Sequence, residues 1–296
     1  AAHRCRARGS CRPGRLGLRH NGASLGGAPG DEGRDAVSRL GEVVASRKIL
    51  WLLVTRDLRL RYAGTFLGYL WTIIDPLAMA AVYWFVFTVI FQTRRVGEQP
   101  YILFLVVGML AWSWFSGAIS EGCRSLTGEA KIVRSSNLPR EVWVARTVMS
   151  KMIEFIFALP VIALLAILFR QPISPYILLF PVAMVLQFML IFGLVLMLAP
   201  LTVIVTDVPR LVKIVLRIGL YLTPVLYAVA NIPANLQWVA ALNPLSGILS
   251  IYRLMFWPGA TASWTVYVTS VVFSVVILAL GFAVFRRLEG PVLKEI

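Results

Sequence analysis

Long stretches without a charged residue constrain this sequence more than any other feature. One of them runs for 30 residues, from Tyr176 to Val205. Across the chain 58% of the residues are apolar and 15% are charged, whereas soluble domains carry about 25% charged residues. About 20 consecutive apolar residues form a helix that crosses a bilayer, where backbone groups must pair within the segment. The sequence therefore predicts an all-α integral membrane protein and excludes an ordinary soluble domain.

Six stretches are apolar enough for us to expect transmembrane helices, which together form a six-helix domain over residues 67–296. They cover residues 70–91, 101–119, 152–169, 176–205, 218–230 and 264–285. The fifth stretch is short, so we expect its helix to begin near Val208, with Lys213 and Arg217 reaching toward the membrane surface. The start of this fifth helix is left open by the sequence.

Two short apolar pieces lie between the fifth and sixth stretches, on either side of Asn243 and Pro244. Neither piece is long enough to span a bilayer. Irregular backbone at membrane depth is tolerated only where protein or a water-filled cavity covers it. We therefore predict a re-entrant helical hairpin on the outer side of the membrane, directly before the last helix.

Residues 1–36 are rich in arginine and glycine and have no apolar period, which predicts a disordered basic tail. The two histidines and two cysteines of this tail lack the spacing of a zinc site, so we expect no metal there. We also expect that part of the tail does not belong to the native protein and that its real start lies nearer Val37 or Val43.

Residues 37–66 mix apolar side chains, such as Leu50, Val54 and Leu58, with many arginines. This pattern is typical of an amphipathic helix that lies in the membrane interface with its basic face toward lipid headgroups. The alternative is a helix packed on a soluble domain.

The positions of the basic residues predict the orientation of the chain. Of 29 lysine and arginine residues, only four fall in segments that we expect outside: Arg94, Arg95, Arg170 and Arg253. Because basic loops stay on the cytoplasmic side, both termini are predicted to be cytoplasmic. The net charge of +15 thus reports orientation, and we expect no nucleic-acid partner.

The spans lack the groups that a membrane enzyme would need. Asp75 and Glu154 lie at the ends of their spans, and Glu154 follows Lys151 by three residues, which predicts an interfacial ion pair. No histidine falls in a span, and there is no Gly-x4-Gly-Lys-Ser/Thr loop for a nucleotide. We expect no catalytic residue, metal or cofactor in this chain; if ATP drives it, a separate subunit binds ATP and Mg²⁺.

The polar segment 121–147 between the second and third spans is too long for a simple connection. It can form a helix up to about Arg134 and is broken before Pro139. We predict that it transmits motion from a cytoplasmic ATPase into the membrane. The residues assigned to this coupling role are Glu129, Lys131, Arg134, Pro139 and Arg140.

Four motifs, in order along residues 38–296, resemble the permease subunits of ABC exporters in the polysaccharide branch. They are RDLRLRYAGTFLGYLWTIIDPL at 56–77, NLPREVWVAR at 137–146, TDVPRLVKIVLRIGLYLTPVLY at 206–227 and LNPLSGILSIYR at 242–253. The resemblance implies a homodimer, two separate ATPase subunits below it, and a lipid-linked glycan that passes between the two permeases.

Two further sets of residues take expected roles from these motifs. We expect one set to fix the interface helix to the inner end of span one: Arg56, Asp57, Arg61, Tyr62 and Trp71. We expect the other to shape an outer gate: Asn243, Pro244 and Arg253.

Aromatic residues recur every four positions in the outer half of span one, at Tyr83, Phe87 and Phe91. This spacing places them on one helix face, and such a row offers rings on which sugar faces can stack. Tyr221 and Tyr227 could line the opposite wall of a channel. The alternative is that these rings pack against helices or lipid; no role is assigned to Trp112 or Trp114.

Together these features predict a permease of the bacterial inner membrane that exports a lipid-linked cell-surface polysaccharide, such as an O-antigen, with an ATP-hydrolysing partner. One alternative is an ABC-type exporter permease for small lipophilic drugs or lipids. The alternative from another class is a polytopic membrane enzyme.

Overall fold

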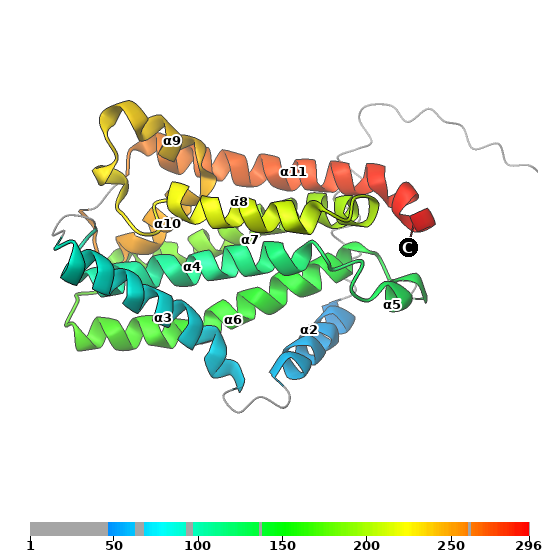
Figure 1. The fold of residues 1–296 in the computed structure, drawn as a ribbon, viewed down its shortest axis with the longest axis horizontal. Coiled ribbons are helices and arrows are strands. Elements are labelled where there is room, and N and C mark those ends of the chain that lie inside the picture. The colour runs from blue at the N-terminus through cyan, green and yellow to red at the C-terminus, as the bar shows by residue number, and fades with distance from the viewer. Residues whose placement is uncertain (1–46, 63–67, 93–96, 136–137, 260–261, 296) are drawn as a thin grey trace, which may run out of the picture.

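The computed structural model describes residues 47–62, 68–92, 97–135, 138–259 and 262–295, and these form helices without a strand. The long helices run side by side along one axis, with α9 and α10 at one end and α5 and the C-terminus at the other (Figure 1). We call these the outer end and the inner end, after the predicted orientation. The predicted disordered tail and residues 37–46 of the interface helix lie outside the described residues.

Five helical segments in the described part of the chain are long and apolar enough to cross a membrane. They are built from α3 (Trp71–Trp84) with the π-helical segment η2 (Phe85–Ile90), α4 (Tyr101–Gly122), α6 (Glu141–Leu168), η3 (Pro175–Leu179) with α7 (Phe180–Ile204), and α11 (Trp264–Glu295). The third segment begins at Glu141, eleven residues before the predicted Met152. Its first turns mix charged and apolar residues, so their composition did not indicate a span.

The predicted fifth helix forms α8 (Val208–Leu222) and starts at the expected residue. Its 15 residues extend about 22 Å at the α-helical rise, less than a bilayer core of about 30 Å. The chain leaves the helix at Thr223 and Pro224. A sixth crossing of the membrane therefore stays a prediction.

The interior of the bundle is centred on α4. In its apolar window 72% of the residues are buried, against 11% for the window of α3 and η2. On the other side, α7 and α11 approach closely because Gly193 and Gly281 face each other: a Cβ on Gly193 would lie 2.6 Å from the carbonyl oxygen of Ile277. Small residues at such contacts are how membrane helices pack tightly.

Two short helices occupy the outer end between α8 and α11. After the single turns η4 (Val229–Asn231) and η5 (Ala234–Leu236), α9 (Gln237–Leu242) and α10 (Pro244–Leu254) meet at Asn243. Neither reaches a spanning length, as the sequence predicted, and α10 is buried along nearly all of its length. Whether the pair re-enters a membrane stays a prediction.

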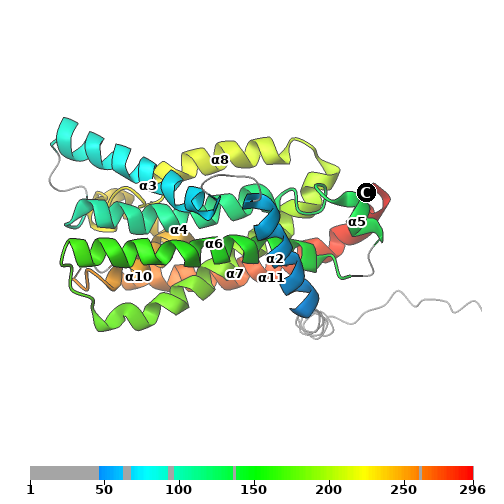
Figure 2. The ribbon, with the colours of Figure 1, turned by 90° about the horizontal axis from the view of Figure 1, so that it is seen from below.

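The interface helix α2 (Arg47–Tyr62) crosses the bundle at a steep angle (Figure 2). Its buried stripe of Leu50, Val54 and Leu58 packs on the bundle, where α2 contacts α6. Trp51 and Leu52 are 58% and 68% exposed. The helix therefore has one apolar face on protein and a second one exposed, which suits an element that lies at a membrane surface.

Candidate functional site

A cluster of charged side chains joins α2 to the inner ends of α4 and α6. The Arg61 guanidinium donates two hydrogen bonds to the Glu121 carboxylate, with Nη1 2.7 Å from Oε1. The same Nη1 lies 3.3 Å from Glu154 Oε1, and Nη2 lies 3.7 Å from Asp57 Oδ2. A bidentate pair of this kind fixes orientation as well as distance.

Lys151 completes this cluster, which we call the inner network. Its Nζ lies 2.8 Å from Glu121 Oε1 and 2.9 Å from Glu154 Oε2, and the second contact confirms the predicted ion pair between Lys151 and Glu154. Burial acts to lower the pKa of Arg61, but the hydrogen bond and charge of Glu121, with the charges of Glu154 and Asp57, outweigh it and raise that pKa. Arg61 therefore stays charged at any pH at which the protein is folded.

The inner network differs from its sequence prediction in what it connects. Asp57 and Arg61 were expected to hold α2 to span one, yet their partners lie on α4 and α6, with Ser150 donating to Asp57 at 3.2 Å. Arg56 is exposed, and the side chain of Tyr62 lies outside the described residues. Glu121 and its pairing with Arg61 were missed, because 60 residues separate the two partners.

The predicted coupling segment forms turns followed by the short helix α5 (Ala130–Ser135). Glu129 accepts a hydrogen bond from Arg146 on α6 at 2.8 Å, and Arg140 contacts Glu289 on α11 at 3.0 Å. The side chains of Lys131 and Arg134 lie outside the described residues, and the carbonyl of Pro139 accepts from the amide of Val142 at the start of α6. The segment is thus tied to two long helices, while its coupling role stays a prediction.

A second arginine organises the outer end. Arg253 on α10 is 4% exposed and donates to the carbonyl oxygens of Pro224 and Val225, at 2.6 and 2.7 Å. Its guanidinium carbon lies 3.6 Å from the centre of the Phe104 ring on α4. These carbonyls belong to the turn where the chain leaves α8, so Arg253 provides the hydrogen bonds that the ended helix no longer supplies.

Asn243 strengthens the same connection from the start of α10. Its side-chain oxygen accepts from the amide of Leu245 at 3.0 Å, and its side-chain nitrogen donates to the Thr223 hydroxyl at 2.8 Å. Pro244 is the first residue of α10, a position where a missing N–H costs nothing. We call Arg253, Asn243 and the turn at 223–225 the outer joint; that its residues act as a gate stays a prediction.

The predicted aromatic row runs along α3 and continues to α8. Tyr83 and Phe87 are half-buried against the core, where Phe87 meets Tyr101 of α4 with ring centres 6.4 Å apart, and Phe91 is exposed. The Tyr83 and Tyr221 hydroxyls are 3.4 Å apart, and the Phe87 and Phe91 ring centres are 6.1 Å apart. The helix is π-helical at Phe85–Ile90, so the row does not follow the α-helical register assumed from the sequence. Tyr227 instead turns to the end of α8, where its hydroxyl donates to the carbonyl of Tyr221 at 3.1 Å.

Two tryptophans without a predicted role pack around α4. Trp114 is 3% exposed, and its ring stacks on Phe155 of α6 with ring centres 5.0 Å apart. Trp112 faces α8, where a Cβ on Gly219 would lie 3.1 Å from its ring. The first joins α4 to α6 and the second joins α4 to α8.

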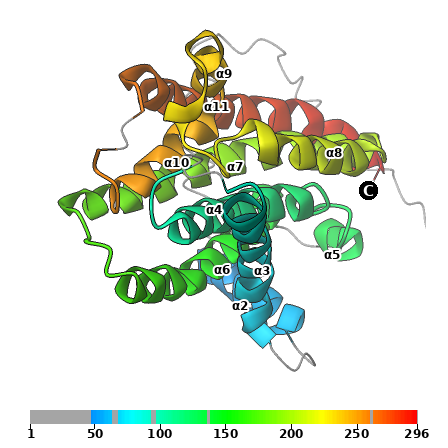
Figure 3. The same ribbon diagram turned by 60° about the vertical axis from the view of Figure 1, so that its left-hand side comes forward.

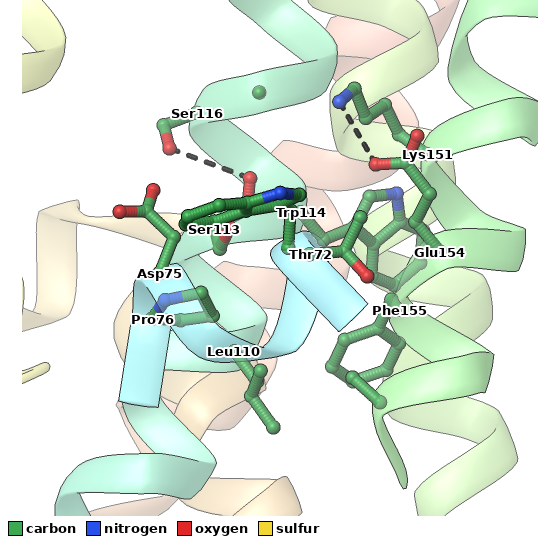
Figure 4. A pocket seen from close by; sticks show the side chains of 13 residues that line it. Thr72, Asp75, Pro76, Leu110, Ser113, Trp114, Ser116, Lys151, Glu154 and Phe155 are labelled. Atoms are coloured by element: carbon green, nitrogen blue, oxygen red, sulfur yellow. Dashed lines mark hydrogen bonds and ion pairs between the residues drawn. The ribbon is translucent and has the colours of Figure 1, made fainter. Parts of the chain in front are cut away.

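A cavity of about 400 Å³ lies between the inner half of α3 and helices α4 and α6 (Figure 4). Its lining is mixed in polarity, and we call it the lateral cavity. The polar and aromatic residues in its lining are Trp71, Thr72, Asp75, Ser113, Trp114, Ser116, Lys151, Glu154 and Phe155. Within the described residues, no group of three or more histidine, cysteine, aspartate or glutamate side chains could hold a metal ion.

Comparison with known proteins adds a family to this geometry. Residues 49–257 match the family described as ABC-2 type transporter. The chain is 29% identical over 245 residues to an O-antigen export system permease protein RfbA of Klebsiella pneumoniae. The aligned region covers 81% of this chain and 92% of that protein. The chain is also 29% identical over 218 residues to an RfbA of the same description from Myxococcus xanthus, with coverages of 73% and 83%.

Proposed function

Because the chain belongs to the ABC-2 type transporter family, we propose that it is the membrane permease of an ATP-driven exporter of lipid-linked cell-surface polysaccharide. Two copies form a channel in the bacterial inner membrane, with both termini in the cytoplasm. A separate subunit binds and hydrolyses ATP with Mg²⁺, and this chain binds no cofactor of its own. The relatives named as O-antigen export permeases support the substrate class.

The exposed surface formed by α3 and α8 is the observation that carries this proposal. Both helices contact α4 on one side (Figure 3) and are open on the other, where Val82, Phe91 and Tyr221 are 54%, 65% and 56% exposed. A second copy placed against these two helices would enclose a path lined by Phe91 and Tyr221 and by the accessible parts of Tyr83 and Phe87. Rings along such a path give a glycan weak, repeated contacts on which it can slide.

The inner end offers the connection that an ATPase partner needs. The coupling segment carries α5 away from the bundle and is tied to α6 by Glu129 and to α11 by Arg140. Motion imposed on α5 would reach both helices through these ion pairs. The inner network then links α6 to α4 and to the interface helix α2.

The test replaces the aromatic row. In cells that make the native glycan, we expect Tyr83→Ala with Phe87→Ala to lower the surface glycan about thirtyfold, since stacking is worth about 1 kcal/mol per ring. Phe157→Ala, which removes a 54% exposed aromatic ring from α6, is the matched control and should leave export unchanged. Unchanged export in the double variant, at equal protein level, would count against the channel on α3 and α8.

A further inference from the structure

The lateral cavity is separate from the aromatic row but shares a helix with it. Asp75 on α3 lines the cavity, and Tyr83 lies eight residues further along the same helix, about 12 Å at the α-helical rise. The cavity is therefore at the inner end of the face that leads to Tyr83. Its volume of about 400 Å³ falls within the usual range for small-molecule sites, about 300–1,000 Å³.

The charges around the lateral cavity disfavour an anion. Lys151 is its single basic lining residue, and this ammonium already contacts Glu121 and Glu154. Asp75 is exposed and has no salt bridge to another described residue. A phosphate or diphosphate would thus meet a carboxylate without a compensating cation, which costs energy near a membrane of low dielectric constant.

Hydrogen-bonding atoms in the wall favour a ligand that both donates and accepts. The Asp75 carboxylate is exposed and the Ser116 hydroxyl is half-buried at the cavity wall, so both can reach a ligand. The Trp114 indole N–H and Glu154 Oε1 are buried below this surface, and Arg61 Nη1 pairs with Glu154 Oε1 at 3.3 Å. A sugar hydroxyl can donate to the Asp75 carboxylate and can donate to or accept from the serine hydroxyl.

The aromatic lining suits the same ligand. Trp71, in the first turn of α3, lines the cavity and is 50% exposed overall. Aromatic faces that stand beside carboxylates and hydroxyls match a sugar ring, which has C–H faces and hydroxyl edges.

We propose that the lateral cavity binds a neutral sugar residue of the lipid-linked glycan on the cytoplasmic side, before the glycan reaches the aromatic row. The inference rests on the proposed function, because it takes the glycan as the substrate. Asp75 accepts from sugar hydroxyls, Ser116 hydrogen-bonds to one, and Trp71 stacks on the ring. The phosphate of the lipid carrier stays outside this cavity.

The experiment uses a photoreactive side chain in the complete exporter, inside cells that make the glycan. Ser113, which lines the cavity, is replaced by p-benzoylphenylalanine, and irradiated protein is digested and searched by mass spectrometry for hexose adducts. The same group is placed at Tyr83 in the aromatic row and at Val272, which is 52% exposed on α11. We expect adducts at Ser113 and Tyr83 and none at Val272.

A second variant tests the role assigned to Asp75. Asp75→Asn keeps the shape of the side chain and should lower the Ser113 adduct about fivefold, as expected for the loss of a partly exposed charged hydrogen bond. Asp207→Asn, which removes an exposed carboxylate paired with Arg210, should leave it unchanged. Equal recovery of the ATPase subunit with each variant shows that the exporter is assembled.

The outcomes separate this inference from the proposed function. Adducts at Tyr83 without adducts at Ser113 would overturn the sugar site and leave the exporter standing. Phospholipid or phosphate adducts alone at Ser113 would also overturn it. Absence of glycan at both positions would contradict the proposed function as well.

Discussion

Arg61 at the inner end and Arg253 at the outer end hold the molecule together in different ways. Arg253 is 4% exposed and donates to the main-chain carbonyls of Pro224 and Val225. The Arg61 side chain is 24% exposed, and its partners are carboxylates. A carbonyl is fixed by the backbone and does not ionise, whereas a carboxylate can exchange one cation for another.

The comparison indicates a fixed joint outside and an adjustable connection inside. At the outer end, α8, α4 and α10 meet around one arginine whose partners cannot change without moving the backbone. At the inner end, Lys151 already shares Glu121 and Glu154 with Arg61, so α2 can shift while each carboxylate keeps a cation. The elements nearest the coupling segment are therefore the ones with exchangeable partners.

The largest effect is expected at the outer joint. Arg253→Met leaves the carbonyls of Pro224 and Val225 without buried donors, and we expect it to lower the free energy of unfolding by about 3 kcal/mol. Arg253→Lys keeps the charge without the planar fork and should recover only part of this loss. Thermal unfolding of the purified protein measures both, and an unchanged midpoint for Arg253→Met would show that the joint is not fixed by this residue.

A smaller effect is expected where α4 passes the same joint. A Cβ on Gly108 would lie 2.8 Å from Arg253 Nη2 and from the carbonyl oxygen of Val225. We therefore expect Gly108→Ala to lower the free energy of unfolding by about 2 kcal/mol through overpacking. Gly117→Ala on the same helix is the control, because its nearest contact is Lys151 Cδ at 3.6 Å. Equal unfolding midpoints for the two variants would contradict the close approach.

Removal of the inner arginine should cost less. Arg61→Ala leaves three carboxylates with one lysine, and we expect it to lower the free energy of unfolding by about 1 kcal/mol. This is less than for a fully buried ion pair, because Arg61 and Glu121 are partly solvated. The loss should shrink in 1 M salt, since screening weakens the repulsion. A double-mutant cycle with Glu121→Gln measures the coupling; a loss as large as that of Arg253→Met would remove the distinction between the two ends.

The smallest effect on stability, with a measurable effect on coupling, is expected in the segment before α6. Glu129→Gln keeps an oxygen acceptor for Arg146, whose side chain is 9% exposed, and should lower the free energy of unfolding by about 0.5 kcal/mol. ATP hydrolysis stimulated by the glycan should fall about threefold, within the range of coupling changes produced by single substitutions. Full stimulation in this variant would mean that the charge of Glu129 has no part in coupling.

The sequence predicted the parts of the fold that depend on long apolar windows. The stretches that became α4, α7 and α11 are uncharged over a spanning length. The break at Asn243 and Pro244 was visible because this pair separates two apolar pieces that are each too short to span, and proline is favoured in the first turn of a helix. The start of α6 was missed because residues 141–151 include charged and polar side chains among the apolar ones, while the helix continues through them. Amino-acid composition does not indicate how far a helix continues beyond its apolar stretch.

The contacts of Arg61 and Arg253 were harder to predict from the sequence than the ion pair of Lys151 and Glu154. The Lys151 and Glu154 pair was predicted because partners three residues apart share a helix face. The pair of Arg61 and Glu121 joins positions 60 residues apart, which only packing brings together. The partners of Arg253 are backbone carbonyls, and any residue type can supply these, so the sequence holds no signal for them.

Purification of the chain with the proposed ATP-hydrolysing subunit tests the central claim most directly. ATP hydrolysis by the reconstituted pair would be measured with and without the lipid-linked glycan extracted from the same cells. The proposed function predicts that the two proteins copurify and that the glycan, but not the free lipid carrier, stimulates hydrolysis. Copurification with no ATPase, or hydrolysis that does not respond to the glycan, would contradict it.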